Sequence, residues 1–103
     1  MSHTLRHEGP VSIIKIQGRF VFSEHQAFRD TYTPLIDRTE TKVIRLDLSA
    51  VNFIDSSTLG MLLLMRERAQ PVGKSIELVE ANETVIKLLK IANFHKMFSV
   101  QGA

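Results

Sequence analysis

One junction in the chain joins a strand pattern to a helix pattern through a run of hydroxyl side chains. Residues 43–48 alternate apolar and polar side chains, which is typical of a strand with one buried face. The hexapeptide Asp55–Gly60 (DSSTLG) follows after a short connection, and the apolar segment 61–65 comes directly after it. A helix over about 57–69 would begin among these hydroxyls, where its first N–H groups lack partners and its dipole is positive. The junction therefore predicts a β/α unit with a place for a cap or an anion.

The rest of the chain continues the alternation of strands and helices. A turn at Glu8–Pro10 separates a short strand, 4–7, from a longer one, 11–17, and the two are expected to form a hairpin strand pair that Gly18 ends. A helix is expected from about Ser23, with a kink or early end at Pro34, and its inward face is Phe28, Tyr32, Leu35 and Ile36. A strand at 75–79 follows, and then a helix capped by Asn82, whose inward face is Val85, Leu88, Leu89 and Ala92. The last expected element is a short strand at 97–100.

The resulting order is β-β-α-β-α-β-α-β. It predicts one α/β domain over residues 1–103, with a mixed sheet of four to five strands and helices packed against it. Helices between strands require crossovers, so the later strands should be mostly parallel and joined by right-handed connections. The length suits one small domain and not two.

Composition excludes several classes of protein. There is no cysteine, so disulfides and thiol chemistry are ruled out. The amino terminus lacks the apolar region of a signal peptide, and the longest apolar stretch, 59–65, is too short to cross a bilayer. We therefore expect a cytoplasmic protein without direct membrane insertion. The net charge is only +2 and its basic residues are scattered among acids, so nucleic-acid binding is not expected.

Side chains that could support catalysis form no recognisable set. The four histidines, His3, His7, His25 and His95, lack the spacing of metal ligands and are better explained as surface or hydrogen-bonded residues. No paired carboxylates or nucleophile with its base can be placed. We expect no metal, no cofactor and no enzymatic activity.

The hydroxyls at the junction admit two interpretations. In the first, one of Ser56, Ser57 and Thr58 caps the following helix, which is the commoner role of a serine at this place. Alternatively, one of them carries a phosphate, which the helix end would attract and the neighbouring Asp55 would oppose. A phosphate adds about −1.5 to −2 charge and would disrupt an apolar docking surface, so the site could act as a binary switch.

The pattern Leu46-Asp47-Leu48 followed by Phe53–Gly60 resembles the signature of STAS domains, specifically the bacterial anti-sigma factor antagonists. Those proteins usually read D-S-S-G-L-G or D-S-T-G-L-G after a buried strand. The resemblance extends over nearly the whole chain, including Gly18 after the second strand and the segment 85–98.

The resemblance implies that the hydroxyl directly after the aspartate, Ser56, is phosphorylated by an anti-sigma factor with serine kinase activity. Asp55 would position and polarise that hydroxyl, Ser57 would cap the helix or shape the loop, and Thr58 would belong to the same loop. The partner-binding surface implied by the family also includes the loop over 18–23. Its candidate residues, with two from the hexapeptide, are Arg19, Phe22, Ser23, Leu59 and Gly60.

Two positions depart from the family pattern. Thr58 stands where glycine is common, which predicts a bulkier loop, and Val21 stands where many antagonists carry an acid. The family implies a module that binds its anti-sigma partner when unphosphorylated and releases it when phosphorylated, with a serine phosphatase reversing the modification. The alternative is a cytoplasmic STAS subunit of a membrane lipid ABC transporter, in which the same helix would dock permanently on an ATPase.

Overall fold

Five strands form one mixed sheet in the computed structural model, which describes residues 2–102. The strands are β1 (Ser2–Glu8), β2 (Val11–Phe20), β3 (Val43–Ile54), β4 (Ser75–Ala81) and β5 (Ser99–Gly102). They lie in the order β1-β2-β3-β4-β5; β1 is antiparallel to β2, and every later pair is parallel. The predicted mixed sheet with parallel later strands is confirmed.

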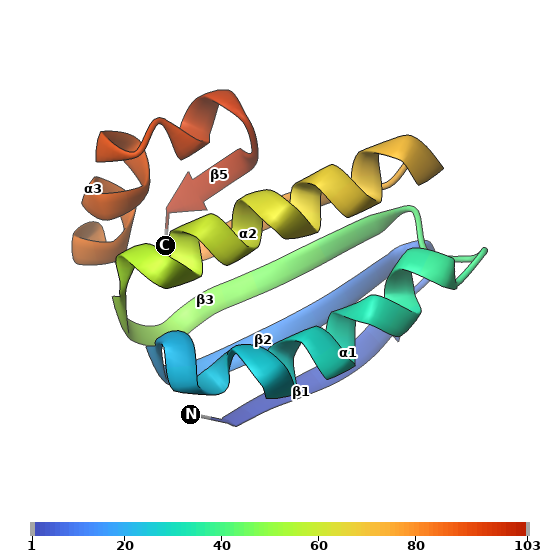
Figure 1. Cartoon of the computed structure of the whole chain (residues 1–103), viewed down its shortest axis with the longest axis horizontal. Helices are drawn as coiled ribbons and strands as arrows, with labels where there is room; N and C mark the ends of the chain where they lie inside the picture. The colour runs from blue at the N-terminus through green and yellow to red at the C-terminus, as the bar shows by residue number, and fades with distance from the viewer. Residues whose placement is uncertain (1, 103) are drawn as a thin grey trace.

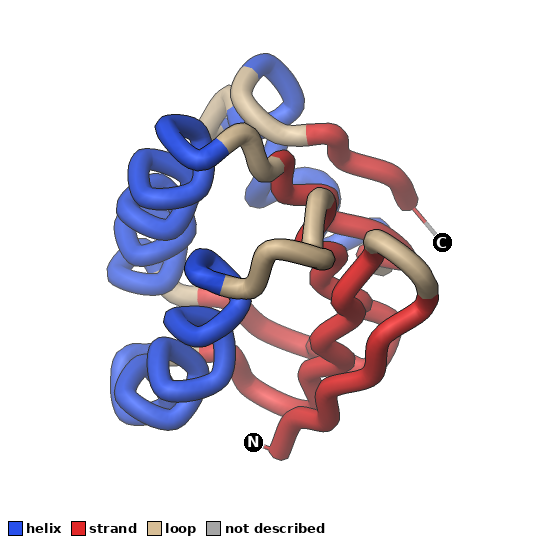
Figure 2. Tube along the Cα trace, turned by 90° about the vertical axis from the view of Figure 1, so that its right-hand side faces the viewer, coloured by secondary structure: helices blue, strands red, loops and turns tan. Residues whose placement is uncertain are grey.

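Within residues 2–102, three helices cover this sheet. They are α1 (His25–Asp37), α2 (Ser56–Ala69) and α3 (Glu83–Ile91), and the 3-10 turns are η1 (Phe22–Glu24), η2 (Gln70–Val72) and η3 (Phe94–Lys96). Helices α1 and α2 lie next to each other on one face of the sheet (Figures 1 and 2). Helix α3 packs against β3 and β4 and leads through η3 to β5. The predicted order of strands and helices is confirmed.

The core lies between the sheet and these helices. Ile14, Ile44, Leu46 and Leu78 of the three central strands are fully buried there. The expected inward face of the first helix is buried as well, at Phe28, Tyr32, Leu35 and Ile36. Met61, Leu62 and Met65 of α2 join the same cluster, whereas Leu64 is 57% exposed. Helix α2 is therefore buried on one side only, although its first half is apolar almost all round.

Several sequence-based expectations about element ends are wrong. Strand β3 does not end at residue 48 but continues to Ile54, and the last strand, expected at 97–100, is Ser99–Gly102 because residues 94–96 form η3. Strand β2 does not end at Gly18 but continues to Phe20, because Gly18 adopts a positive φ of 88° at a shift in the β2–β3 register. Helix α1 does not end early at Pro34 but continues to Asp37. Proline has no N–H to donate to the carbonyl of Asp30, one turn earlier. Both Pro34 and Asp30 are exposed, so this carbonyl can face water instead.

Replacing Asn82 by alanine should lower the free energy of unfolding by roughly 1–2 kcal/mol. The Asn82 side chain accepts a hydrogen bond from the Val85 N–H at 2.9 Å and donates one to the Val51 carbonyl at 3.1 Å, so it caps α3 and ties it to β3. Urea unfolding followed by circular dichroism measures the loss. Asn52→Ala, at an exposed strand position, is the control; equal midpoints for the two variants would contradict the predicted cap.

Candidate functional site

The hexapeptide Asp55–Gly60 lies where the carboxyl ends of β2 and β3 meet. Phe20 and Ile54, the last residues of these two strands, are paired in register. The chain leaves β2 through Val21 into η1 and leaves β3 through Asp55 into α2. The parallel pairing thus places the start of α2 beside the connection between β2 and α1 (Figure 1).

Asp55 is the cap of α2 and also its link to η1. One carboxylate oxygen, Oδ1, accepts hydrogen bonds from the Thr58 N–H at 2.8 Å and the Ser57 hydroxyl at 2.8 Å. The other oxygen, Oδ2, accepts one from the Phe22 N–H at 3.0 Å. The aspartate, and not a serine, therefore caps the helix, so the expected capping role of Ser57 is wrong.

The hydrogen bonds to Asp55 stabilise its charged form. Burial by itself raises the pKa of this carboxyl, but the hydrogen bonds from Thr58, Ser57 and the Phe22 backbone outweigh burial and lower the pKa to about 2. Asp55 is therefore ionised at neutral pH and places a fixed negative charge at the start of α2.

Thr58 lies inside the protein and not in an exposed loop. It is the third residue of α2, it is fully buried, and its hydroxyl donates to the Phe20 carbonyl at 2.8 Å. The same oxygen is 2.8 Å from Nε2 of the buried His25. Because the hydroxyl proton is used toward Phe20, His25 must be the donor in this second bond. The expectation of a bulkier loop at Thr58 is wrong, because its side chain points inward and ties α2 to β2 and α1.

His25 extends the site in a way that the sequence reasoning missed. Desolvation lowers the pKa of His25 and the nearby Arg29 lowers it further, while the charge of Asp55 partly opposes this. A neutral imidazole with its proton on Nε2 matches the observed contact with Thr58. The available signal was its spacing, because residue 25 lies three positions before Phe28 and seven before Tyr32, on the inward face of α1.

Ser56, the predicted phosphorylation site, is exposed and is the first residue of α2. Its hydroxyl has no hydrogen-bond partner within residues 2–102. Asp55 does not position this hydroxyl as expected, because the hydroxyl that donates a hydrogen bond to the Asp55 carboxylate is that of Ser57. Gly60 is exposed on α2, and Leu59 is half-buried against the core.

The other predicted partner-binding residues fall into two separate places. Phe22 and Ser23 lie in η1 and are exposed; Phe22 is 72% exposed, and its ring packs edge-on against that of His25 at a centroid distance of 5.3 Å. Arg19 instead lies in β2, with its guanidinium 5.0 Å from the centroid of the Phe53 ring. Arg19 and Phe53 alternate with the buried Phe20 and therefore lie on the sheet face away from the core.

An open groove of about 290 Å³ adjoins the start of α2. It runs between α1 and α2, and the side chains that line it are Phe22, His25, Arg29, Tyr32, Ser57, Met61 and Leu64, together with Gly60. Phe22, Ser57 and Gly60 thus come together, whereas Arg19 is not part of this surface. The sequence reasoning did not identify Arg29 or Tyr32, because the groove joins two helices that are far apart in sequence.

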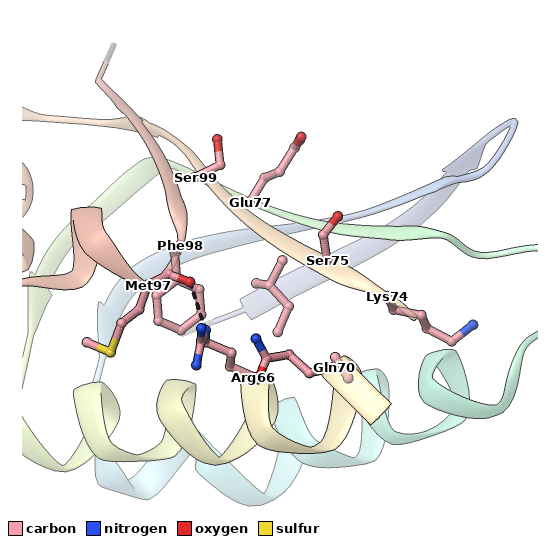
Figure 3. Close-up of a pocket in the computed structure, with 10 residues that line it drawn as sticks. Arg66, Gln70, Lys74, Ser75, Glu77, Met97, Phe98 and Ser99 are labelled. Atoms are coloured by element: carbon pink, nitrogen blue, oxygen red, sulfur yellow. Dashed lines mark hydrogen bonds between the residues drawn. The ribbon is translucent and has the colours of Figure 1, made fainter. Parts of the chain in front are cut away.

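A second cavity of about 230 Å³ lies between the second half of α2 and the strands β4 and β5 (Figure 3). Arg66 lines it, but its Nε donates to the Met97 carbonyl at 2.8 Å. Ser75, Glu77 and Ser99 extend their side chains away from α2, so these three polar groups do not point toward Arg66 and Gln70 (Figure 3). No predicted site residue lines it.

The part of the chain that the structure describes contains no cluster of three or more histidine, aspartate and glutamate side chains able to hold a metal ion. None of the helices in this part is both long and apolar enough to cross a membrane. The chemical character of the site is that of exposed hydroxyls beside a carboxylate and a partly apolar groove.

Comparison with known proteins identifies relatives over almost the full chain. A STAS-domain containing protein of Pseudomonas aeruginosa (strain UCBPP-PA14) is 40% identical over 93 residues, which cover 90% of each protein. Among solved structures, a putative anti-sigma factor antagonist from Thermotoga maritima is similar with a TM-score of 0.86 and 20% identity, over 98% of this chain and 86% of that one. The anti-sigma factor antagonist SpoIIAA in its unphosphorylated form is similar with a TM-score of 0.76 and 16% identity, over 99% and 89%.

The same fold also forms part of a larger protein. The murine anion transporter Slc26a9 contains a region similar to 84% of this chain with a TM-score of 0.72 and 20% identity, which is 14% of the transporter chain. The family model described as "Mlab, STAS domain" matches residues 3–100. This match spans nearly all of the sequence, so the chain belongs to the STAS domain family.

Proposed function

We propose that this STAS domain is an anti-sigma factor antagonist that works as a protein-binding module switched by phosphorylation of Ser56. The unmodified domain would bind an anti-sigma factor with serine kinase activity and so free that regulator's other client. Phosphorylation would release the partner, and a serine phosphatase would restore binding. The observation that carries the proposal is the exposed Ser56 hydroxyl at the first position of α2, one residue from a groove-lining serine.

The charges at the start of α2 explain why a phosphate would oppose binding. Asp55 is already ionised there, because its pKa is about 2. A phosphate on Ser56 would add about −1.5 to −2 charge next to it. A partner that covers this end of α2 would have to desolvate both groups, which costs free energy unless the partner pairs them with cations.

The proposed phosphoryl transfer would be carried out by the kinase partner. The Ser56 oxygen would form a bond to the terminal phosphorus of ATP while the bond from that phosphorus to the bridging oxygen breaks, so that ADP leaves, and the Ser56 proton would pass to a base of the kinase. Asp55 is not positioned for that role, since its carboxylate accepts from Ser57, Thr58 and Phe22. The domain itself would act without a cofactor and without enzymatic activity, and it would meet its ATP-dependent partner in the cytoplasm.

A second candidate is a cytoplasmic subunit of a membrane lipid ABC transporter. The observation in its favour is that the STAS fold also occurs within a solved anion transporter. In this alternative α2 would dock on an ATPase irrespective of the state of Ser56, and Ser56 would be only an exposed residue of the first helical turn.

Affinity capture from native lysate with three baits separates these two candidates. We expect wild type and Ser56→Ala to retain the same kinase-like protein, and Ser56→Asp to recover at least about ten times less of it, which corresponds to roughly 1.4 kcal/mol. Ser99→Asp is the matched control, since it places the same charge on an exposed serine of β5. Equal recovery of that protein by all baits would refute the switch, and a membrane ATPase bound equally by all would support the transporter subunit.

A further inference from the structure

Gly60 is an unusual residue for its place in α2. It lies five positions after the cap Asp55, inside the helix, where glycine is less favourable than alanine by roughly 0.5–1 kcal/mol. Apart from the two adjoining residues and the nearby backbone of α2 itself, no heavy atom of the described residues lies within 4 Å of the point where a Cβ would be, so neighbouring side chains do not require a glycine. The residue lines the groove between α1 and α2, so the missing side chain leaves the groove open at its middle.

The groove follows α2 for two helical turns and is bordered by exposed apolar side chains. Its lining residues on α2 run from Ser57 to Leu64, which is two helical turns or about 10 Å. Tyr32 and Met61 are almost fully buried and form its apolar floor. Phe22 is 72% exposed and Leu64 is 57% exposed, so two large apolar side chains border the groove without being covered by the domain itself.

The charge of the groove is positive. Arg29 lines it, and Arg68 lies nearby, with its guanidinium 6.0 Å from the centroid of the Tyr32 ring. Among the described residues that line it, none has an acidic side chain. The carboxylate of Asp55, at the start of α2, already accepts hydrogen bonds from three donors. A ligand with a carboxylate over Arg29 would therefore match the charge of the groove.

We propose that this groove receives an amphipathic helix of the protein partner, which passes its backbone close to Gly60 and places a carboxylate side chain opposite Arg29. The inference rests on the proposed function and adds the chemistry of the segment that is bound. Glycine at position 60 allows a close approach of the two helices, and Phe22 and Leu64 supply the apolar contact on either side.

This arrangement connects the groove to the phosphorylation switch. Ser57 lines the end of the groove and Ser56 precedes it. A phosphate on Ser56 would then face an incoming segment that already carries the negative charge required by Arg29. The same carboxylate that favours binding to the unmodified domain would be repelled by the phosphorylated one.

Photo-crosslinking in the native cell tests which face of the domain the partner contacts and identifies the segment of the partner that binds there. The full chain carries p-benzoylphenylalanine at Leu64 in one sample and at Ile91, which is 80% exposed on α3, in the matched sample. We expect Leu64 to crosslink to a segment of another protein with helical apolar spacing and an aspartate or glutamate within one turn. Arg29→Glu should lower this yield at least ten-fold, and replacing the mapped acid of the partner by lysine should restore it.

Gly60 variants test the close approach without relying on the crosslinker. A synthetic peptide of the mapped segment is titrated calorimetrically into wild type, Gly60→Ala and Gly60→Leu. Both variants should melt at or above the wild-type temperature, because they remove a helical glycine. Gly60→Leu should nevertheless bind the peptide at least ten-fold more weakly, and wild-type affinity in this folded variant would refute the proposed approach.

Each crosslinking outcome decides between the inferences. A partner captured from Ile91 but not Leu64, and lost on Ser56→Asp, would overturn the groove while leaving the switch intact. A crosslink from Leu64 to a second copy of this chain, to lipid or to a segment without an acid would also overturn the proposed occupant. No crosslinked protein from either position would contradict both the groove and the protein-binding function.

Discussion

Thr58→Val is expected to lower the free energy of unfolding by about 2–5 kcal/mol, although the two side chains have nearly the same shape. The hydroxyl donates to the Phe20 carbonyl and accepts from His25 Nε2, and the residues involved are buried. Valine would leave one acceptor and one donor without partners. Each unsatisfied buried group costs about 1–3 kcal/mol, which exceeds the small gain from a more apolar side chain.

Chemical unfolding of Thr58→Val beside Thr84→Val measures this cost. Thr84 is exposed in the first turn of α3, so its replacement provides a matched control at a helix start. The double variant Thr58→Val with His25→Phe should recover part of the loss, because it removes the unpaired donor as well. A change below about 0.5 kcal/mol, similar to that of a surface substitution, would show that the buried network contributes little.

The network around Thr58 also explains why the start of α2 and η1 form one surface. Thr58 fixes α2 to the end of β2 through Phe20, and Asp55 binds the Phe22 backbone from the other side. Phe22 is thereby fixed although its ring is largely exposed. We infer that substitutions at Thr58 would disturb partner binding as well as stability, so binding assays on these variants require a measured folded fraction.

The fold was predictable because each element has its own local pattern. The period-2 alternation of residues 43–48 and the apolar spacing of Phe28, Tyr32, Leu35 and Ile36 each report which side is buried, and the order of patterns then fixes the parallel sheet. The ends of β2 and β3 were less predictable. A glycine commonly marks the end of a strand, but Gly18 accommodates a register shift within a longer strand.

The site was predictable as a location but not as a hydrogen-bond network. The hexapeptide identified the start of α2, and Asn82 identified the cap of α3. However, the adjacent residues Asp55, Ser56 and Ser57 are all of types that can cap a helix. Only the backbone φ and ψ angles decide which of them lies at the cap position, and here it is Asp55. The partners of Thr58 come from β2 and α1, more than 30 positions away, so sequence spacing could not reveal them.

The groove between α1 and α2 could not be predicted from the sequence for a similar reason. Its two walls come from α1 and α2, and the strand β3 separates them along the chain. Arg29 and Leu64 each look like ordinary surface residues in their own helix. Their relation depends on the packing of the two helices on the same sheet face, which follows from the fold and not from a local motif (Figure 2).

Asp55→Ala is expected to lower the free energy of unfolding by about 2 kcal/mol at neutral pH, through loss of the cap and of the contact with Phe22. Part of this contribution depends on pH. The pKa of Asp55 is about 2 in the folded protein and 3.8 is its ordinary value, so ionised Asp55 stabilises the fold above pH 3.8. This contribution, roughly 1–2 kcal/mol after allowance for solvent screening, is lost as the pH falls toward 2.

Unfolding of wild type, Asp55→Ala and Asp55→Asn between pH 2 and pH 7 separates the charge from the cap. Asparagine keeps an oxygen that can accept from the Thr58 N–H, but it does not titrate. The stability difference between wild type and Asp55→Asn should therefore shrink as the pH falls from about 4 toward 2, because only wild type loses a stabilising charge there. Parallel stability curves for these two proteins over that interval would show that the Asp55 charge does not stabilise the fold, and would leave its role as a neutral cap.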